Sequence, residues 1–239
     1  KAYKLSISGL KGGHSGVEID KQRANAIKLA ARLLYLVKAD VRLASFVGGI
    51  KHNAVPANAE VVFATDKFDS LKEGLDALVA DLKEEYRVED PGLTISFTEV
   101  TADQVYTKDL SDSVIDMIMA LPDGVQYMSK DIEGLVQTSL NNSVILENDG
   151  KLVLTTSVRS ASSSSLREIL NRVTIIANRM GAVAREYSSY PAWQYEAVSP
   201  LRDIAEKIYV EMYGKEPNIT SIHAGLECGL LKNVLPNTE

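Results

Sequence analysis

The sequence predicts an α/β fold of the α+β sandwich type, in which two ferredoxin-like units follow one another in tandem. The first hundred residues show strand and helix patterns in the order β-α-β-β-α-β, the split βαβ order of a ferredoxin-like sandwich. The next hundred residues repeat much of that order, and the pattern changes after residue 197. We therefore expect one domain over 1–197, with halves of about 1–100 and 101–197, and a short α/β segment over 198–239.

The periodic patterns of polar and apolar residues predict the strands and helices of the first half. Residues 3–9 alternate polar and apolar side chains, which predicts a strand that runs into a glycine-rich loop. A helix is expected over 19–39, because apolar side chains recur every three or four residues from Ile27 to Val37. The same two periods predict the other elements of this half: strands over 41–49 and 59–66, a helix over 69–87 and a strand over 93–100.

The second half contains a strong hairpin signal. Residues 134–148 and 151–161 alternate in polarity, and they are joined at Asp149-Gly150, a pair that favours a tight turn between two strands. Three further elements complete this half: helices over 108–121 and 163–180, the second opened by serines that can cap it, and a closing strand over 182–191.

The last segment begins with a helix over 199–213, with Ser199 as the N-cap and Pro200 at its first position. Residues 217–231 then predict a short buried strand that turns sharply into another helix. A strand, a turn and a helix in series indicate a separate α/β layer, so we place the boundary near residue 197.

Composition excludes some functions. Of the 239 residues, 45% are hydrophobic and 24% are charged, as in ordinary soluble globular proteins. The net charge of −6 argues against a nucleic-acid partner, which normally needs a basic face. No apolar run approaches the roughly 20 residues of a membrane span. A single cysteine, Cys228, fits a reducing compartment, so we expect a cytoplasmic protein. The absence of an initiator methionine suggests a piece of a longer protein.

The loop "GLKGGHSG", residues 9–16, resembles three kinds of functional loop: a zinc site, a nucleophile elbow and a phosphate-binding loop. Zinc needs several converging ligands, and the three histidines of the chain are widely spaced and form no ligand pair. A nucleophile elbow at Ser15 would need glycine where Val17 stands. No phosphate-loop pattern can be found either. From spacing alone, two interpretations stay open: a tight glycine turn in which His14 has no role, or a loop that delivers His14 to a site.

Residues 9–34, "GLKGGHSGVEIDKQRANAIKLAARLL", resemble the start of the lid domain of the aminoacyl-histidine dipeptidases, also called peptidase D or Xaa-His dipeptidases. These enzymes belong to the di-zinc aminoacylase and carboxypeptidase superfamily. Residues 48–60, 154–164 and 222–231 agree in order and spacing, so the resemblance covers essentially the whole chain. The first and last stretches are specific to this family, whereas the other two are shared more widely.

The resemblance implies a protein of roughly twice this length, in which the lid is inserted into a discontinuous catalytic domain. The two zinc ions of the family are held by an H-x-D pair, a Glu-Glu pair, an aspartate and a histidine near the C-terminus. All of these ligands would lie outside residues 1–239. We therefore expect no metal ligand in this chain, and no hydrolysis by this chain alone.

The resemblance also assigns roles to residues. His14 would be the catalytic residue, a donor to the oxyanion of the tetrahedral intermediate. Arg159 would bind the C-terminal carboxylate of the substrate, and Asn53 the substrate backbone or the same carboxylate. Without the resemblance, Arg159 and Asn53 are ordinary exposed polar residues.

Glu227 and His223 lie at the expected strand-to-helix turn, where α/β sheets often place ligand contacts, and the resemblance places this turn beside the substrate pocket but not among the zinc ligands. Glu227 would pair with the free amino group of the substrate, or it is simply an acid at a helix N-terminus. Asn141 and Asn142, within residues 139–143, are candidates for the same cleft, and we assign no role to them.

Two hypotheses on function follow. The first is a fragment of a zinc-dependent dipeptidase that hydrolyses Xaa-His dipeptides of the β-alanyl-histidine type, and forms a homodimer through its lid domain. The second is a non-catalytic tandem ferredoxin-like module for ligand binding or dimerisation. In single-lid relatives the histidine enters the active site of a neighbouring subunit. A duplicated lid could replace that neighbour, so action of His14 in cis or in trans stays open.

Overall fold

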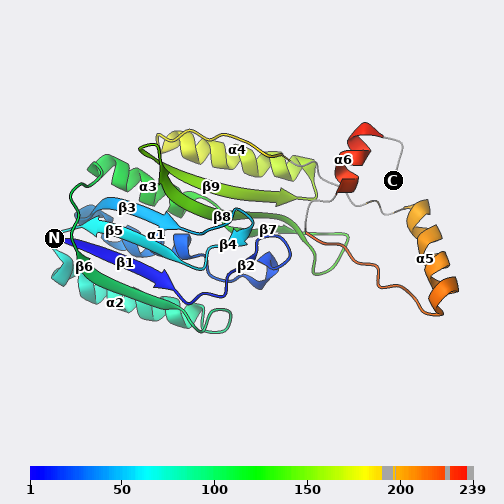
Figure 1. Ribbon diagram of the computed structural model, residues 1–239, viewed down its shortest axis with the longest axis horizontal. Helices are drawn as coiled ribbons and strands as arrows, with labels where there is room; N and C mark the ends of the chain where they lie inside the picture. Colours follow the sequence, from blue (N-terminus) through cyan, green and yellow to red (C-terminus); the bar gives the residue numbers. More distant parts are fainter. Residues whose placement is uncertain (190–195, 197, 224–226, 236–239) are drawn as a thin grey trace.

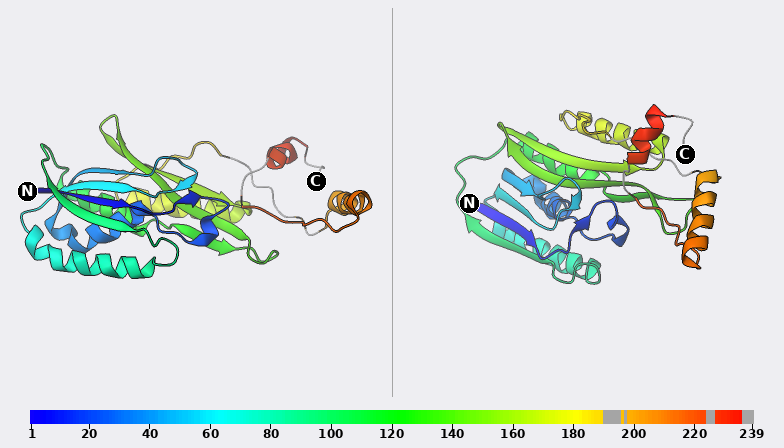
Figure 2. Two further views of the ribbon diagram at one scale, coloured as in Figure 1. Left: turned by 60° about the horizontal axis from the view of Figure 1, so that its bottom comes forward. Right: turned by 45° about the vertical axis from the view of Figure 1, so that its right-hand side comes forward.

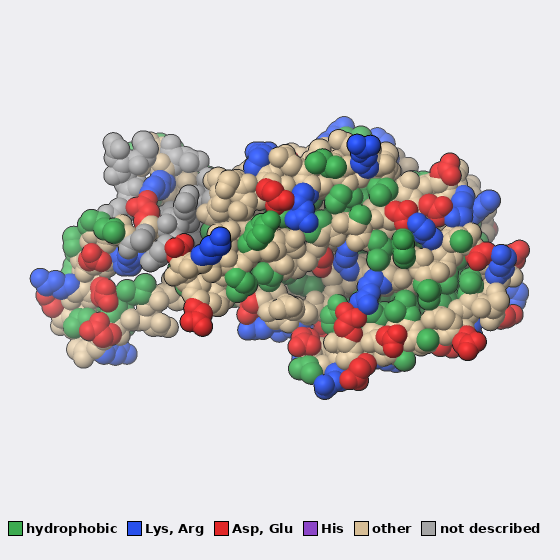
Figure 3. Space-filling view, turned by 180° about the vertical axis from the view of Figure 1, so that it is seen from behind, with side chains coloured by type: hydrophobic (Ala, Val, Ile, Leu, Met, Phe, Trp, Pro, Cys, Tyr) green, Lys and Arg blue, Asp and Glu red, His purple; other side chains and the backbone are tan. Residues whose placement is uncertain are grey.

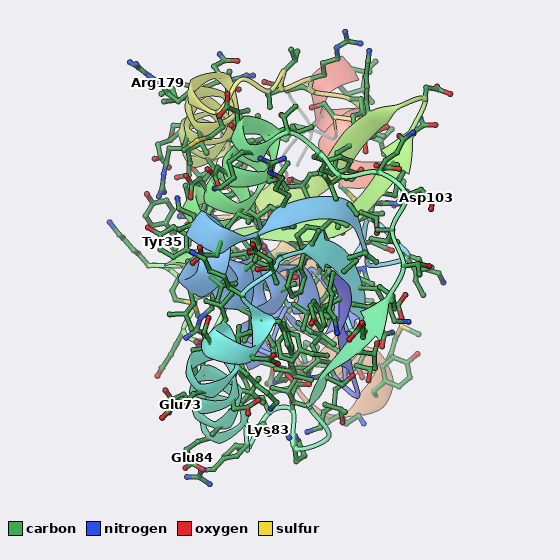
Figure 4. The ribbon with its side chains drawn as sticks, turned by 90° about the vertical axis from the view of Figure 1, so that its left-hand side faces the viewer. Tyr35, Glu73, Lys83, Glu84, Asp103 and Arg179 are labelled. Carbon is green, nitrogen blue, oxygen red and sulfur yellow. The ribbon has the colours of Figure 1, made fainter. Side chains whose placement is uncertain are left out.

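The fold is one antiparallel sheet covered by a row of helices. The computed structural model describes residues 1–189, 196, 198–223 and 227–235. Among these residues, seven strands form the sheet in the order β6-β1-β5-β3-β8-β7, and β9 pairs with β8. Helices α2, α1, α3 and α4 lie side by side against it, and Figure 4 shows them along one side of the strands.

The first half has the expected ferredoxin-like order. β3 lies two places from β1, and β6 two places from β5, which is the split βαβ arrangement. Its elements are β1 (Ala2–Ser8), α1 (Ala26–Val37), β3 (Arg42–Gly48), β5 (Ala59–Ala64), α2 (Phe68–Glu85) and β6 (Thr94–Val100). All neighbouring strands in this part are antiparallel.

The second half extends this sheet instead of building a second sandwich. Its elements are α3 (Lys108–Ala120), β7 (Gly124–Met128), β8 (Val136–Asn148), β9 (Lys151–Ser160) and α4 (Ser163–Arg179). The expected hairpin is confirmed as β8 and β9, whereas β7 was not predicted. The prediction of a complete second ferredoxin-like unit is wrong, because the described half has the order α-β-β-β-α.

Two expected strands are missing from the described residues. Residues 182–189 and 217–223 carry no strand, and residues 190–191 and 224–226 of the same predictions lie outside the described residues. Their side-chain patterns suit a strand, but a strand also needs a neighbouring backbone for its hydrogen bonds. Val183 is 78% exposed and Ile219 is 52% exposed, and the described parts of both segments form no strand.

The helix expected over 19–39 is shorter and begins later. A 3₁₀ turn, η1 (Ile19–Lys21), ends at Gln22, whose φ of 51° is left-handed. α1 then starts after Asn25, whose side chain accepts hydrogen bonds from the backbone N–H groups of Ile27 and Lys28. Residues 9–25 are therefore a long connection, and this connection carries His14.

The main core lies between the sheet and α1, the central helix of the row. Most of the largest fully buried side chains come from the strands and from α1, and they include Leu5, Phe46, Phe63, Leu33 and Leu34. α1 buries eight of its twelve residues, because α2 and α3 cover its two flanks. This core belongs mainly to the first half, and the second half adds Ile145 of β8 and three residues of α3: Val114, Ile115 and Ile118.

The two halves also meet through a polar junction. Asn25 donates from Nδ2 to Oδ1 of Asp123 at 3.1 Å and to the carbonyl oxygen of Asn142 at 3.0 Å. Asn142 donates from its backbone N–H and from Nδ2 to the same carboxylate oxygen, both at 2.9 Å. Burial raises the pKa of Asp123 to about 6, although these hydrogen bonds and the charge of Lys28 act to lower it.

The C-terminal helices lie apart from this body. α5 (Pro200–Tyr213) has the predicted Ser199 cap and proline at its start, and α6 (Glu227–Val234) follows. α5 stands clear of the sheet in Figures 1 and 2, and none of its residues is buried. One face of α5 exposes a stripe of apolar side chains: Leu201, Ile204, Ile208 and Met212.

The molecular surface shows no gathering of one charge on the face that Figure 3 presents, where acidic and basic side chains are interspersed. Among the described residues, no helix combines the length and the apolar character needed to cross a bilayer.

The backbones of the halves touch at Gly49, which offers a test of the junction. Gly49 has a φ of +68°, and a Cβ there would lie 1.8 Å from the carbonyl oxygen of Ser143. Gly150 in the β8–β9 turn has nearly the same φ, +69°, but no atom near its Cβ position. We expect Gly150→Ala to lower the free energy of unfolding by about 1–2 kcal/mol through strain alone. Gly49→Ala should cost about 2–3 kcal/mol more, because the methyl group also meets backbone. Urea unfolding of both variants measures the difference, and equal losses would contradict this contact.

Candidate functional site

A two-stranded ladder places His14. β2 (Gly13–His14) pairs with β4 (Ala54–Val55), with His14 opposite Ala54. The N–H of Ser15 donates to the carbonyl oxygen of Asn53 at 2.9 Å. The Nδ2 of Asn141, on β8, donates to the carbonyl oxygen of Ala54 at 2.8 Å and so ties this ladder to the main sheet. Neither strand of the ladder was predicted, because two-residue strands leave no periodic signal.

The ring of His14 is held in one tautomer. Its Nδ1 lies 3.1 Å from the backbone N–H groups of both Gly16 and Val17. Because Nδ1 accepts these hydrogen bonds, the proton of the neutral ring is on Nε2. The ring therefore offers an N–H donor on the side that faces away from its own loop.

The backbone around His14 is fixed by Glu18, a residue to which the sequence analysis gave no role. Oε2 of Glu18 accepts from the N–H of His14 at 2.9 Å, and Oε1 pairs with Arg23 at 3.0 Å. Arg23 also donates to the carbonyl oxygen of Gly12 at 2.5 Å. The hydrogen bond from His14 and that from Arg23 lower the pKa of Glu18.

Gly16 marks the place where three distant segments meet. A Cβ placed on Gly16 would lie 3.1 Å from Cε1 of His14 and 3.2 Å from Nε of Arg159. The same Cβ would lie 2.4 Å from the carbonyl oxygen of His223, so a larger residue does not fit here. The structure thus brings His14 and Arg159 together within one chain.

Arg159 presents an unpaired donor at this place. It lies on β9 opposite Ser139 of β8, which fixes the face of the sheet from which it projects. Its Nε is buried and has no hydrogen-bond partner among the described residues, and the same is true of Oγ of Ser15. Burial lowers the pKa of Arg159 from its ordinary value, but a guanidinium stays charged near neutral pH. A buried, charged N–H without a partner suits an anionic ligand.

His223 is a site residue to which the sequence analysis assigned no role. Its Nε2 lies 2.7 Å from Oγ of Ser139, and the side chain is buried. Burial, and then the charge of Arg159, lower the pKa of His223 to about 4. Arg159 and His223 both line a hollow of about 1600 Å³ between β9, α4 and residues 219–223. His223 is therefore neutral at physiological pH, and it does not add a second positive charge beside Arg159.

The other two predicted site residues, Asn53 and Glu227, are not part of the contact between His14 and Arg159 at Gly16. Asn53 adjoins the loop through its backbone, as the acceptor for Ser15. Glu227 is exposed at the first position of α6, where a helix N-terminus favours an acid. Glu227 is not among the described residues that line the hollow. Within the described part of the chain, no group of three or more His, Cys, Asp or Glu side chains is placed to hold a metal ion.

Comparison with known sequences shows that the region around His14 is similar to a known family of domains. Residues 5–90, from β1 to the turn after α2, match the sequence model of the peptidase dimerisation domain. This part of the chain is therefore similar to a peptidase dimerisation domain. His14 and Asn53 lie within the matched part of the dimerisation domain, whereas Arg159 and His223 lie beyond it.

Two relatives extend the match over the whole chain. The cytosol non-specific dipeptidase of Escherichia coli (strain K12) is 35% identical over 244 residues, which cover 100% of this chain and 50% of that protein. The crystal structure of aminoacylhistidine dipeptidase from Vibrio alginolyticus superposes with a TM-score of 0.92 at 36% identity, over 99% of this chain and 49% of that one. The chain thus spans about half the length of both relatives. The resemblance to the aminoacyl-histidine dipeptidases is confirmed.

The pKa of His223 predicts a pH dependence of stability. Its folded pKa of about 4 lies below the ordinary value of 6.5, so the unfolded chain binds more protons between these pH values. Stability from this group is therefore lost as the pH falls from about 6.5 to about 4, by up to roughly 3 kcal/mol. Asp123 acts in the opposite direction, because its pKa of about 6 is raised, and its contribution is lost as the pH rises.

The variant His223→Gln separates these two effects, since its amide can still bond to Ser139 and does not titrate. We expect urea unfolding to show that the wild type loses more stability than His223→Gln between pH 7.5 and pH 4.5. The Asp123 contribution is common to both proteins and cancels. A stability difference between the two proteins that does not change with pH would rule out a buried neutral His223.

Proposed function

We propose that this chain is the lid-bearing part of a zinc-dependent dipeptidase that hydrolyses Xaa-His dipeptides of the β-alanyl-histidine type. The observation that carries the proposal is the meeting at Gly16 of His14, whose neutral ring has its proton on Nε2, and Nε of Arg159, which has no hydrogen-bond partner among the described residues. The names of the two relatives, both dipeptidases, support the substrate class. In this proposal residues 1–197 form the lid, and 198–239 begin the returning part of the catalytic domain.

His14 and Arg159 would act on two parts of the substrate. As water attacks the peptide carbon, negative charge builds on the carbonyl oxygen, and Nε2–H of His14 donates to it. Arg159 binds the terminal carboxylate through its unpaired N–H. Asn53 bonds to the substrate backbone or to the same carboxylate. Glu227 is the candidate for the free amino group, with the helix-terminal acid as the alternative.

In this proposal, as the family resemblance implies, the ligands of the two zinc ions lie outside residues 1–239. Zinc would supply activation of the attacking water and further stabilisation of the oxyanion. The contribution of this chain is the orientation of the dipeptide and the donor from His14.

The second half of the chain supports action of His14 in cis. β8 pairs with β3, and α3 packs against α1, so the second half covers the side of the first half that contains these elements. Arg159 of this second half meets His14 at Gly16 within the same chain, without a partner subunit. We further propose a homodimer through the lid domain, in keeping with the matched family, and a cytoplasmic location, in keeping with the name of the E. coli relative.

The non-catalytic alternative makes a different use of the same site. Arg159 would then bind a carboxylate ligand that is not hydrolysed. Assay of the full-length protein on β-alanyl-histidine, with and without a chelator, separates the two proposals. Hydrolysis that the chelator abolishes supports the dipeptidase, and absence of hydrolysis in zinc-loaded protein supports the module.

In the full-length protein we expect His14→Ala to lower kcat by about 100–1000-fold, because one oxyanion donor is lost. Bound zinc, measured by elemental analysis, should stay the same. Gln104→Ala is the control, since Gln104 is exposed, does not line the hollow and should leave kcat within about twofold. Loss of zinc from His14→Ala would show that His14 is a ligand and not a donor.

For Arg159→Ala we expect KM to rise by about 10–100-fold for dipeptides with a free carboxylate, as when a hydrogen bond to a charged group is lost. A C-terminally amidated dipeptide should show a much smaller change. Arg167→Ala on the exposed face of α4 is the control for loss of charge. Equal effects on the free and the amidated substrate would remove the carboxylate role from Arg159.

A further inference from the structure

We infer that Asp90 is a positioning residue for His14, because its carboxylate joins the two ends of the loop that carries the histidine. Its effect on turnover rests on the proposed function, whereas its effect on the His14 ring does not.

Both oxygens of Asp90 are used on this loop. The N–H of Lys11 donates to Oδ1 and the N–H of Ala24 donates to Oδ2, each at 2.7 Å. These donors stand at the two ends of residues 11–24, and His14 lies between them. Asp90 is 1% exposed, so water does not compete for its oxygens. Hydrogen bonds from N–H groups to a buried carboxylate are among the stronger ones in proteins.

Asp90 itself is held by the body of the fold. Its N–H donates to the carbonyl oxygen of Tyr86 at 2.8 Å, and its own carbonyl accepts from Leu93 at 3.0 Å. Close by, the backbones of Gly9 and Gly92 touch, since a Cβ on Gly9 would lie 2.0 Å from the carbonyl oxygen of Gly92. The turn that bears Asp90 is therefore fixed to the end of β1, and it can serve as a rigid anchor.

Asp90 can affect His14 because only a short, glycine-rich segment lies between Lys11, which Asp90 binds, and the histidine. Only Gly12 and Gly13 separate Lys11 from His14, and their φ angles are +61° and +137°. Two glycines in a row allow wide backbone rotation, so a free Lys11 would leave β2 held on one side only, by its ladder with β4. Glu18 and Arg23 brace the loop internally, but they belong to the loop and move with it. Asp90 adds a second tie, from both ends of the loop to the turn after α2.

The substitution Asp90→Asn tests this anchoring. It keeps the size of the side chain but puts an NH₂ group against one of the two backbone N–H donors, so one end of the loop is released. In the full-length protein we expect kcat to fall by about 10–100-fold, as for a misplaced catalytic group, with KM within about twofold and zinc content unchanged. Asp81→Asn, which removes the same charge from the exposed face of α2, is the matched control and should change neither kcat nor KM by more than about twofold.

The ring of His14 supplies a readout that general destabilisation would not move. In ¹⁵N-histidine-labelled full-length protein, the wild type should show His14 with its proton on Nε2. In Asp90→Asn we expect the shifts of both ring nitrogens to move toward the average of two tautomers, because the Nδ1 contacts with Gly16 and Val17 loosen. Unchanged His14 shifts in a folded Asp90→Asn would overturn the inference, whether or not kcat falls.

A further variant covers a failure of Asp90→Asn to fold. Asp90→Glu keeps the charge and both acceptor oxygens on a longer side chain, and it should show a smaller kcat loss with a smaller change in the His14 shifts. Wild-type kcat and His14 shifts in Asp90→Glu would count against the inference. If His14→Ala leaves turnover unchanged, the proposed function fails, but the His14 shifts still decide whether Asp90 anchors the loop.

Discussion

The register of β8 against the first half of the sheet is the constraint on which the site depends. β8 reaches β3 at a single register pair, Gly48 opposite Ile145, and the backbone of Gly49 lies against Ser143. β8 in turn sets β9, where Arg159 stands opposite Ser139. Because side chains alternate between the two faces of a strand, a slip by one residue would turn Arg159 to the other face. The meeting with His14 would then be lost.

The polar junction explains why that register is unique. Asn25, Asp123 and Asn142 satisfy one another across three segments, and a slip of β8 by one residue would move Asn142 away from its two partners. Asn25 also caps α1, so the same side chain starts the central helix and locks the second half in place. A buried polar group is costly when it is left unpaired, and this cost disfavours other arrangements. Hydrophobic contacts alone would tolerate small shifts between the halves.

Local patterns predicted much of this fold, and long-range contacts account for the rest. The apolar face of α1, the turn at Asp149-Gly150 and the cap at Ser199 depend on neighbouring residues, and the structure has all three. The strand expected over 182–191 has a suitable pattern, but the part that is described, residues 182–189, has no strand beside it. β7 is short, and it exists because β8 offers an edge. Periodicity cannot show either fact, because each depends on the presence or absence of a distant segment.

The candidate site, like the fold, was predicted from the sequence only in part. His14, Asn53 and Arg159 were found through a family resemblance, and the structure shows that His14 and Arg159 meet. Glu18 and Asp90 were missed, since each gains its role from a contact that only the folded chain makes. His223 was expected beside the pocket, but without a role of its own. A faint signal existed for Glu18, an acid four residues after His14. None existed for Asp90, which lies in the turn after α2.

The apolar stripe of α5 has a consequence for the study of this chain. Leu201, Ile204 and Ile208 are 60%, 57% and 48% exposed, and they follow one another at helical spacing. Two such stripes can pack together as in a short coiled coil, because burial of apolar surface drives association without any specific partner. A dimer of residues 1–239 in solution therefore has two possible seams, one on the sheet domain and one on α5. The molecular mass of the dimer does not distinguish the two seams. A charged side chain introduced on the α5 stripe would disrupt only a dimer that forms through α5.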